Sequence, residues 1–307
     1  MKHITVLEAS EKWGVTERMV RYYCNQGLIP GARQEKTSWM IPEAVEKPLR
    51  KHRAEMLPPA LARKLCNQQK KRNYHGMYDY TILNLTYSSC RMASCRLTRK
   101  QVAEIIKTGK TQASSEPMKI SDLIEVRNHI ACVDKILRES MVPLTSKYIK
   151  GLHKMLFGGT VDEQLEQVTA GVFRKNEPRG RKVPPAKEVA DLLTQLIRQY
   201  EKREEKGLLD ILDFHVQFLR LAPFGDGNGR VGRLIMFKEC LRNDIMPFIL
   251  DDKRRSRYIE GIKTWNEHQN PLLEVVLEAQ QRYGTQIELQ KLYAHSRLYL
   301  PANYTED

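Results

Sequence analysis

The stretch of this 307-residue chain from Leu221 to Arg233 reads L-A-P-F-G-D-G-N-G-R-V-G-R. Apolar residues at helical spacing flank it on both sides, and its glycines alternate with Asp226 and Asn228. The spacing predicts a tight helix-loop-helix whose second helix begins near Gly229. Glycines let a loop adopt positive φ angles and turn successive N–H groups toward one point. The stretch therefore predicts an anion-binding loop.

The residues around the loop indicate which anion it would hold. A helix that begins near Gly229 presents its N-terminal dipole and unpaired N–H groups to the loop. Arg230 and Arg233 share a face of its first turn, where the dipole disfavours cations unless an anion lies beside them. Asp226 offers a hard oxygen ligand for Mg2+. We expect a polyphosphate here, with Mg2+ held by Asp226.

Three simpler interpretations fit the loop less well. The D-G and N-G pairs are common in β-hairpin turns, but a hairpin needs alternating strands on both sides. G-x-G alone is weak support for a dinucleotide site, which would also need a preceding strand. A Walker loop would end in Gly-Lys-Ser/Thr, and that ending is absent from this loop. The helical flanks favour the polyphosphate loop.

Residues 223–233 resemble the signature of Fic-domain proteins, which is long and specific. The resemblance implies a mainly α fold, with an all-helical Fic core and a short β-hairpin flap. The usual reaction of that family moves AMP from ATP onto a hydroxyl side chain of a target protein. The chain would then be a protein adenylyltransferase that uses ATP and Mg2+ and whose partner is a protein with a Ser, Thr or Tyr hydroxyl.

The resemblance also assigns roles to residues. The family's general base is a histidine directly before Pro-Phe, and this catalytic position is Ala222 here. Arg230 would contact the α- and β-phosphates and Arg233 the γ-phosphate, while Tyr258 could stack near the adenine or belong to the core. The implied ATP-binding set is Phe224, Gly225, Asp226, Gly227, Asn228, Gly229, Arg230, Arg233 and Tyr258.

Residues 88–98 resemble the inhibitory helix that precedes many Fic cores. The family pattern is Ser or Thr, three residues, Glu, then Gly or Asn, and the Glu pairs with the second signature arginine. Ser89 matches, whereas Ala93 stands at the Glu position and Ser94 replaces Gly or Asn. We expect this helix to span 78–96, and Thr98 to cap the next helix.

Alanine thus stands at both decisive positions, Ala222 and Ala93. We expect the chain to be catalytically inactive and free of the inhibitory contact, as in an engineered variant. A natural pseudoenzyme is the competing interpretation, in which the chain is a non-enzymatic regulator that senses a nucleotide. The helical histidines His129, His153 and His215 show no shared metal-ligand spacing, and we expect structural roles for them.

Residues 170–185 resemble the Fic flap, a hairpin that aligns the target's backbone by strand addition. Phe173 and Arg174 lie near its start, and Pro178 and Gly180 form its tip. Basic residues stand where apolar docking residues are often found, so we expect target docking to differ from the family pattern.

Residues 4–45 combine two short helices around Gly14, the second capped by Thr16, with two short strands around a polar tip. This resembles the winged helix-turn-helix of excisionase and mercury-regulator type, whose second helix enters the major groove. The resemblance implies double-stranded DNA as a partner, and a transferase that limits its own expression. A solvated helix pair for protein contacts is the alternative. The implied DNA contacts are Thr16, Arg18, Arg21, Tyr22, Arg33 and Lys36.

Charge and composition complete these expectations. The net charge of +14 favours a polyanionic partner. Nine basic and two acidic residues lie between Glu46 and Asn73. We expect a DNA-binding domain over 1–48, a basic linker over 49–77 and a Fic domain over 78–307.

The six cysteines form no C-x-x-C pair, and the sequence shows neither a signal peptide nor a long apolar run. We therefore expect a cytoplasmic protein with reduced thiols and no membrane partner. A homo-oligomer is left open.

Overall fold

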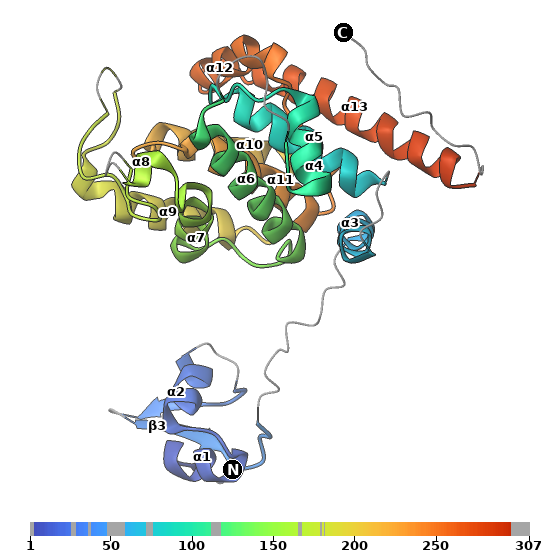
Figure 1. The fold of residues 1–307 in the computed structure, drawn as a ribbon. Coiled ribbons are helices and arrows are strands. Elements are labelled where there is room, and N and C mark those ends of the chain that lie inside the picture. Colours follow the sequence, from blue (N-terminus) through green and yellow to red (C-terminus); the bar gives the residue numbers. More distant parts are fainter. Residues whose placement is uncertain are drawn as a thin grey trace. The chain divides into compact units, whose positions relative to one another are not determined.

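The computed structural model describes residues 3–25, 29–35, 38–47, 59–71, 76–111, 118–164, 168–178, 180 and 182–295 (Figure 1). The chain divides into two compact units, Met1–Met56 and Leu57–Asp307. All strands of the described residues lie in the first unit, and the second unit is helical. In the described part of the chain, no helix is both long and apolar enough to cross a bilayer.

The first unit has its own small core. A capping box between Thr5 and Glu8 starts its first helix, and Gly14 ends that helix with φ +60°. The strands form an antiparallel sheet in the order β1-β3-β2, in which Gln34 pairs with Trp39. The expected helix pair and strand pair are therefore present. The elements are β1 His3–Ile4, α1 Val6–Trp13, α2 Glu17–Asn25, β2 Arg33–Glu35 and β3 Ser38–Pro42.

The second unit is an array of helices, as the sequence predicts (Figure 1). Its α-helices are α3 Ala60–Lys71, α4 Met77–Arg91, α5 Arg99–Thr108, α6 Ile120–Arg138, α7 Ser146–Phe157, α8 Val161–Gln164, α9 Val189–Lys202, α10 Leu208–Leu221, α11 Asn228–Arg242, α12 Arg255–Thr264 and α13 Asn270–His295. Two 3-10 turns, η1 Ala186–Glu188 and η2 Asp252–Arg254, precede α9 and α12.

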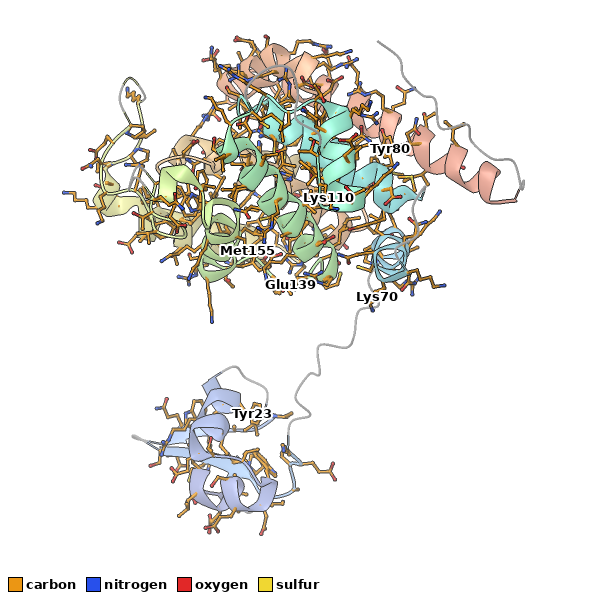
Figure 2. The ribbon with its side chains drawn as sticks, viewed as in Figure 1. Tyr23, Lys70, Tyr80, Lys110, Glu139 and Met155 are labelled. Carbon is orange, nitrogen blue, oxygen red and sulfur yellow. The ribbon has the colours of Figure 1, made fainter. Side chains whose placement is uncertain are left out.

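Helix α11 lies at the centre of this unit. It contacts α3, α4, α6, α7 and α10, and it is buried on all sides, so its polar residues must find partners inside the protein. Side chains fill the space between the helices (Figure 2). Gly232 allows α10 to approach closely, because a Cβ there would lie 2.8 Å from His215 Cε1.

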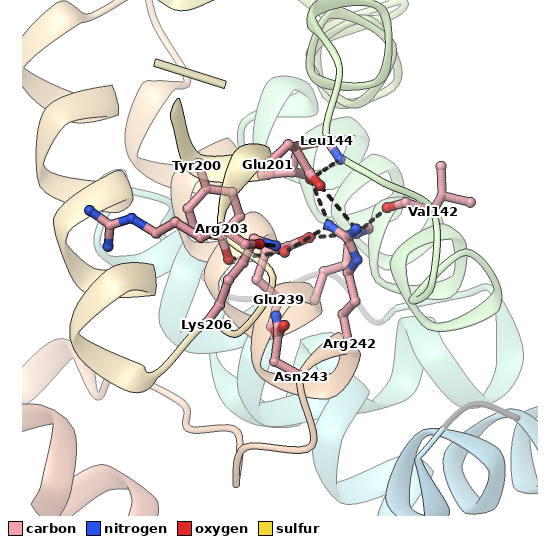
Figure 3. Close-up of polar contacts among 10 residues, drawn as sticks. Val142, Leu144, Tyr200, Glu201, Arg203, Lys206, Glu239, Arg242 and Asn243 are labelled. Atoms are coloured by element: carbon pink, nitrogen blue, oxygen red, sulfur yellow. Dashed lines mark hydrogen bonds and ion pairs between the residues drawn. The ribbon is translucent and has the colours of Figure 1, made fainter. Parts of the chain in front are cut away.

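A buried network of charged groups fixes the C-terminal half of α11 (Figure 3). Lys238 Nζ donates to Glu239 at 2.7 Å and to the Val142 carbonyl at 2.6 Å. Glu239 also accepts from the Tyr200 hydroxyl at 3.0 Å and pairs with Arg242 at 3.3 Å. The paired groups offset the cost of removing these charges from water.

Two expectations about the region before the core are wrong. The range 49–77 is not a linker throughout, because α3 lies within it and buries Ala62 and Leu65 in the main core. Helix α4 ends at Arg91 and not at 96. The chain turns there, because Ser94 has φ +72° and the N–H of Cys95 donates to the Cys90 carbonyl. The cap at Thr98 is confirmed, and it forms a capping box with Gln101.

The β-hairpin expected at the flap is also wrong for the described residues of 168–185, which contain no strand. Prolines lack the N–H that a strand pair needs, and Pro178, Pro184 and Pro185 lie in this segment. The N–H of Arg174 donates instead to the Pro223 carbonyl at 3.0 Å. The segment is therefore held by the signature loop.

Candidate functional site

The loop between α10 and α11 begins at Ala222, which caps α10 in a left-handed conformation with φ 44° and ψ 64°. Left-handed backbone is uncommon for alanine, whereas histidine, asparagine and aspartate are several-fold enriched there. The residue is 1% exposed. The backbone at position 222 thus suits histidine better than the alanine it carries.

Asn228 closes the loop on itself. Its Oδ1 accepts from the N–H of Phe224 at 3.0 Å, and its Nδ2 donates to the Phe224 carbonyl at 2.8 Å. Gly227 has φ +77°, and a Cβ there would lie 2.3 Å from the Phe157 ring. The side chain of Asn228 therefore shapes the loop, which leaves backbone N–H groups at the start of α11 as the groups suited to a phosphate.

His153 braces the same loop from α7. Its Nδ1 accepts from the N–H of Gly171 at 2.9 Å, so its Nε2 carries the proton that is donated to the Asp226 carbonyl at 3.1 Å. The ring stacks on Phe224 with centroids 3.8 Å apart. Burial lowers the pKa of His153 to about 4, which keeps the ring neutral. The expectation of a structural histidine is confirmed here.

Arg230 turns into the protein instead of toward a ligand. It is 3% exposed, pairs with Glu125 of α6 and lies 4.9 Å from the centroid of the Phe157 ring. It also approaches Asp226 at 3.5 Å. These contacts place the Arg230 side chain under the loop, between Glu125 and Asp226, and its expected role on the phosphates stays a prediction.

Arg233 is 7% exposed and is held by α4. Its Nε donates to the Ser89 hydroxyl at 3.0 Å and its Nη2 to the Ser89 carbonyl at 2.9 Å. Among the ion pairs of the described residues, none involves Arg233. Its positive charge is thus without a carboxylate in this part of the structure.

Asp226 suits a metal bound together with a phosphate. Its side chain is 64% exposed, and its Oδ1 accepts from the N–H of Gly227 at 2.5 Å. The described residues contain no cluster of three or more metal-binding side chains. Mg2+ needs none, because it takes one or two carboxylates, water and substrate phosphates.

A cavity of about 580 Å³ opens beside the start of α11. This volume is in the range of small-molecule sites. Asn228, Gly229, Arg233 and Tyr258 line it, whereas Arg230 does not. None of the described lining residues is acidic. The remaining lining residues are Met92, Lys182, Val183, Leu219, Arg220, Arg255, Ile259, Ile262 and Lys263.

The flap segment contacts the loop through Arg174 and Phe173. The Arg174 guanidinium donates to the carbonyls of Ala222 at 2.9 Å, Pro184 at 2.5 Å and Asn176 at 3.3 Å. The Phe173 ring packs on Phe224 with centroids 5.7 Å apart. One side chain thus joins both ends of the flap segment to the backbone at Ala222.

The turn after α4 brings Ala93, the position at which the sequence predicts an inhibitory residue, close to the cavity. Ala93 is half-buried in this turn, and its neighbour Met92 lines the cavity. The Met92 carbonyl accepts from Arg255 Nε at 3.3 Å. Ser94 has φ +72°, the backbone region in which glycine and asparagine are favoured. The left-handed backbone at position 94 therefore explains why the family pattern has glycine or asparagine there.

Two of the expected DNA contacts are exposed and ion-paired in the first unit. The Arg21 side chain is 58% exposed and pairs with Glu17, while that of Arg33 is 61% exposed and pairs with Glu35. Thr16 is exposed as well. Lys36 and the side chains of Arg18 and Tyr22 lie outside the described residues.

Comparison with known proteins agrees with this geometry. Residues 143–240 match the family model described as the Fic/DOC family. The match supports a Fic domain in this part of the chain. Proteins named "Protein adenylyltransferase Fic" are similar over 155 residues, with 30% identity in Drosophila persimilis and 29% in Drosophila melanogaster. The match covers 47% of this chain and 30% of each relative.

Solved structures show the same fold. A Fic-domain-containing signaling protein from Bacteroides thetaiotaomicron covers 79% of this chain, with 99% of its own length matched, a TM-score of 0.62 and 17% identity. Fic-1 from C. elegans covers 75% of this chain, with 72% of its own length matched, a TM-score of 0.58 and 18% identity. The helical Fic fold expected from the signature is therefore supported.

Several site residues have no sequence signal of their own. Glu125 lies 105 positions from its partner Arg230, and Arg255 and Lys182 line the cavity without a motif. His153 was expected to be structural, but not to support the loop. Tyr258 belongs to the core, since it is 4% exposed, and it also lines the cavity, while its expected place near an adenine stays a prediction.

Proposed function

We propose that the second unit is a protein adenylyltransferase domain of the Fic type, in which the present chain binds ATP but lacks the group that activates the acceptor. The observation that carries this proposal is the cavity at the start of α11. Gly229 and Arg233 line it, and none of its described lining residues is acidic. The relatives named protein adenylyltransferase support the same class of reaction.

ATP would bind with its phosphates at the start of α11. Backbone N–H groups of Asn228 and Gly229 suit the α- and β-phosphates, since the first turn of a helix leaves them without intrahelical partners. Arg233 would meet the γ-phosphate. Asp226 would hold Mg2+, which neutralises phosphate charge. Tyr258 and Ile262 offer surfaces for the base.

In the transfer step, an acceptor hydroxyl would attack the α-phosphorus, and the bond to the pyrophosphate leaving group would break. The hydroxyl proton needs a base, and Ala222 offers none. Loss of a general base costs about 10²- to 10⁴-fold in rate. His215 does not replace it, because its Nε2 lies 2.6 Å from the Tyr258 hydroxyl within the core.

Calorimetric titration of the full chain with ATP and Mg2+ tests the site. The Arg233→Ala variant should bind ATP about 10-fold more weakly, as expected for the loss of a charged hydrogen bond. Arg257→Ala is the control, because Arg257 is 51% exposed, pairs with Glu278 and does not line the cavity. Equal ATP binding by Arg233→Ala and the unchanged chain would contradict the site.

Labelled ATP tests the reaction. The chain as it stands should not label protein in a lysate, and the Ala222→His variant should do so. If the chain binds ATP and Ala222→His still transfers nothing, the non-enzymatic, nucleotide-sensing regulator becomes the better interpretation. Equal labelling by both chains would contradict the role given to the base.

We propose separately that the first unit binds duplex DNA near the protein's own gene. The exposed Arg21 and Arg33 support this, because exposed ion pairs are weak and can be exchanged for phosphate contacts. Footprinting should show a protected site that is lost when Arg18→Ala and Arg21→Ala are combined. Arg63→Ala in α3, as control, should not change the protected sequence. Only salt-sensitive, sequence-blind retention would contradict specific binding.

A further inference from the structure

Four helices of the second unit converge on the Arg233 guanidinium. Arg233 belongs to α11, and Ser89 of α4 accepts two of its hydrogen bonds, at 3.0 and 2.9 Å. Tyr258 of α12 lies beside the Arg233 guanidinium, and both residues line the cavity. His215 of α10 lies beyond Tyr258, with its Nε2 at 2.6 Å from the Tyr258 hydroxyl. These residues form a buried chain from His215 to Ser89.

The chain has a fixed direction. Arginine only donates, so the Tyr258 oxygen can only accept from Arg233, and its own proton must then go elsewhere. The Nε2 of His215 lies 2.6 Å from this hydroxyl and accepts its proton in the tautomer that carries hydrogen on Nδ1, which requires a neutral ring. Burial lowers the pKa of His215 to about 3, so the ring is neutral at pH 7. In this arrangement His215 holds the Tyr258 hydroxyl so that its oxygen faces a donor, and Arg233 is the neighbouring donor.

The glycines of G-R-V-G-R make this arrangement possible. A Cβ at Gly229 would lie 3.1 Å from Arg233 Nη1, so the guanidinium folds back over the first turn of α11. A Cβ at Gly232 would lie 2.9 Å from His215 Nδ1. A phosphate bound at this helix terminus would thus meet a guanidinium whose orientation is already set.

We propose that Tyr258 is a positioning residue for Arg233, and that its hydroxyl sets the preference of the cavity for a nucleoside triphosphate over a diphosphate. This inference rests on the proposed function, in which Arg233 meets the γ-phosphate. It differs from a role of the Tyr258 ring as an adenine platform, because such a platform would bind both nucleotides equally well.

The Tyr258→Phe variant separates the two roles, since it keeps the ring and removes the hydroxyl. Calorimetry on the full chain with Mg2+ should show ATP binding weakened about 10-fold and ADP binding unchanged. Tyr283→Phe is the matched control, because its hydroxyl is also buried and lies 2.6 Å from Thr81 Oγ1. Unchanged ATP binding, or equal losses for ATP and ADP, would overturn the proposal.

A second measurement needs no nucleotide. Proton exchange at Arg233 Nε, followed by nitrogen-15 NMR and assigned with Arg233→Lys, should be faster in Tyr258→Phe than in the unchanged chain and in Tyr283→Phe. An unchanged exchange rate would overturn the positioning role. If neither ATP nor ADP binds the unchanged chain, the proposed function fails, and the exchange rate still decides whether Tyr258 orders Arg233.

Discussion

Arg233 and Ser89 are joined by two hydrogen bonds, from Nε to the serine hydroxyl at 3.0 Å and from Nη2 to the serine carbonyl at 2.9 Å. This contact fixes the end of α4 against the start of α11. Ala93 follows Ser89 by four residues in the turn that ends α4, and its neighbour Met92 lines the cavity together with Arg233. The side chain at position 93 can therefore influence the charge beside Arg233.

The first prediction concerns this position. Ala93→Glu would place a carboxylate where it can pair with Arg233 and compete with the γ-phosphate, so ATP affinity should fall about 10-fold or more. Ala93→Gln is the control, since it has nearly the same size without the charge. Calorimetry with ATP and Mg2+ measures both variants. Equal losses in the two would show that bulk, and not charge, is responsible.

The second prediction concerns the backbone at Ala222, whose φ is 44°. A left-handed conformation costs a non-glycine residue about 1–2 kcal/mol, which offsets the entropy that glycine loses on folding. Ala222→Gly should therefore leave the free energy of unfolding unchanged or raise it. Ala190→Gly, at an exposed position in α9, should lower it by about 1 kcal/mol. Urea denaturation compares the two, and equal losses would contradict the strain at Ala222.

Local sequence predicted the elements whose causes are local. The glycines between Leu221 and Arg233 require a loop, and Thr98 caps a helix with Gln101 three residues later. The end of α4 was missed because Ser94 carries no turn signal, yet adopts φ +72°. Helix α3 was predicted to be linker because it has more charged residues than buried ones, and only Ala62 and Leu65 are buried.

The contacts that shape the site are not local, and this is why sequence reasoning did not find them. Arg230 was expected on a phosphate because it stands in the first turn of a helix. Its partner Glu125 lies on another helix, 105 residues away, and no spacing within one element could reveal it. The same holds for the carbonyls that Arg174 binds at Ala222 and Pro184.

The third prediction concerns the buried pair of Lys238 and Glu239, which are 0% and 1% exposed in their side chains. Lys238→Met would leave Glu239 with one cation fewer in the core, and removing one partner of a buried pair costs about 3–5 kcal/mol. Adding Glu239→Gln should recover much of the loss. Urea denaturation measures both variants, and a double variant no more stable than Lys238→Met would contradict the coupling.

The last prediction is the pH dependence that His153 gives to stability. Burial lowers its pKa from 6.5 to about 4 in the folded chain. Between these values the unfolded chain binds a proton at this residue and the folded chain does not, so the free energy of unfolding falls as the pH falls from 6.5 to about 4. One proton corresponds to about 1.4 kcal/mol per pH unit.

Denaturation at several pH values checks this slope. His153→Gln removes the titrating ring, so its stability should depend less steeply on pH than that of the unchanged chain, by up to one proton. His268→Gln is the control, because His268 is exposed beyond α12. The loss on acidification should begin with the loop, since protonated Nδ1 can no longer accept from Gly171. An unchanged slope in His153→Gln would show that this ring does not link pH to folding.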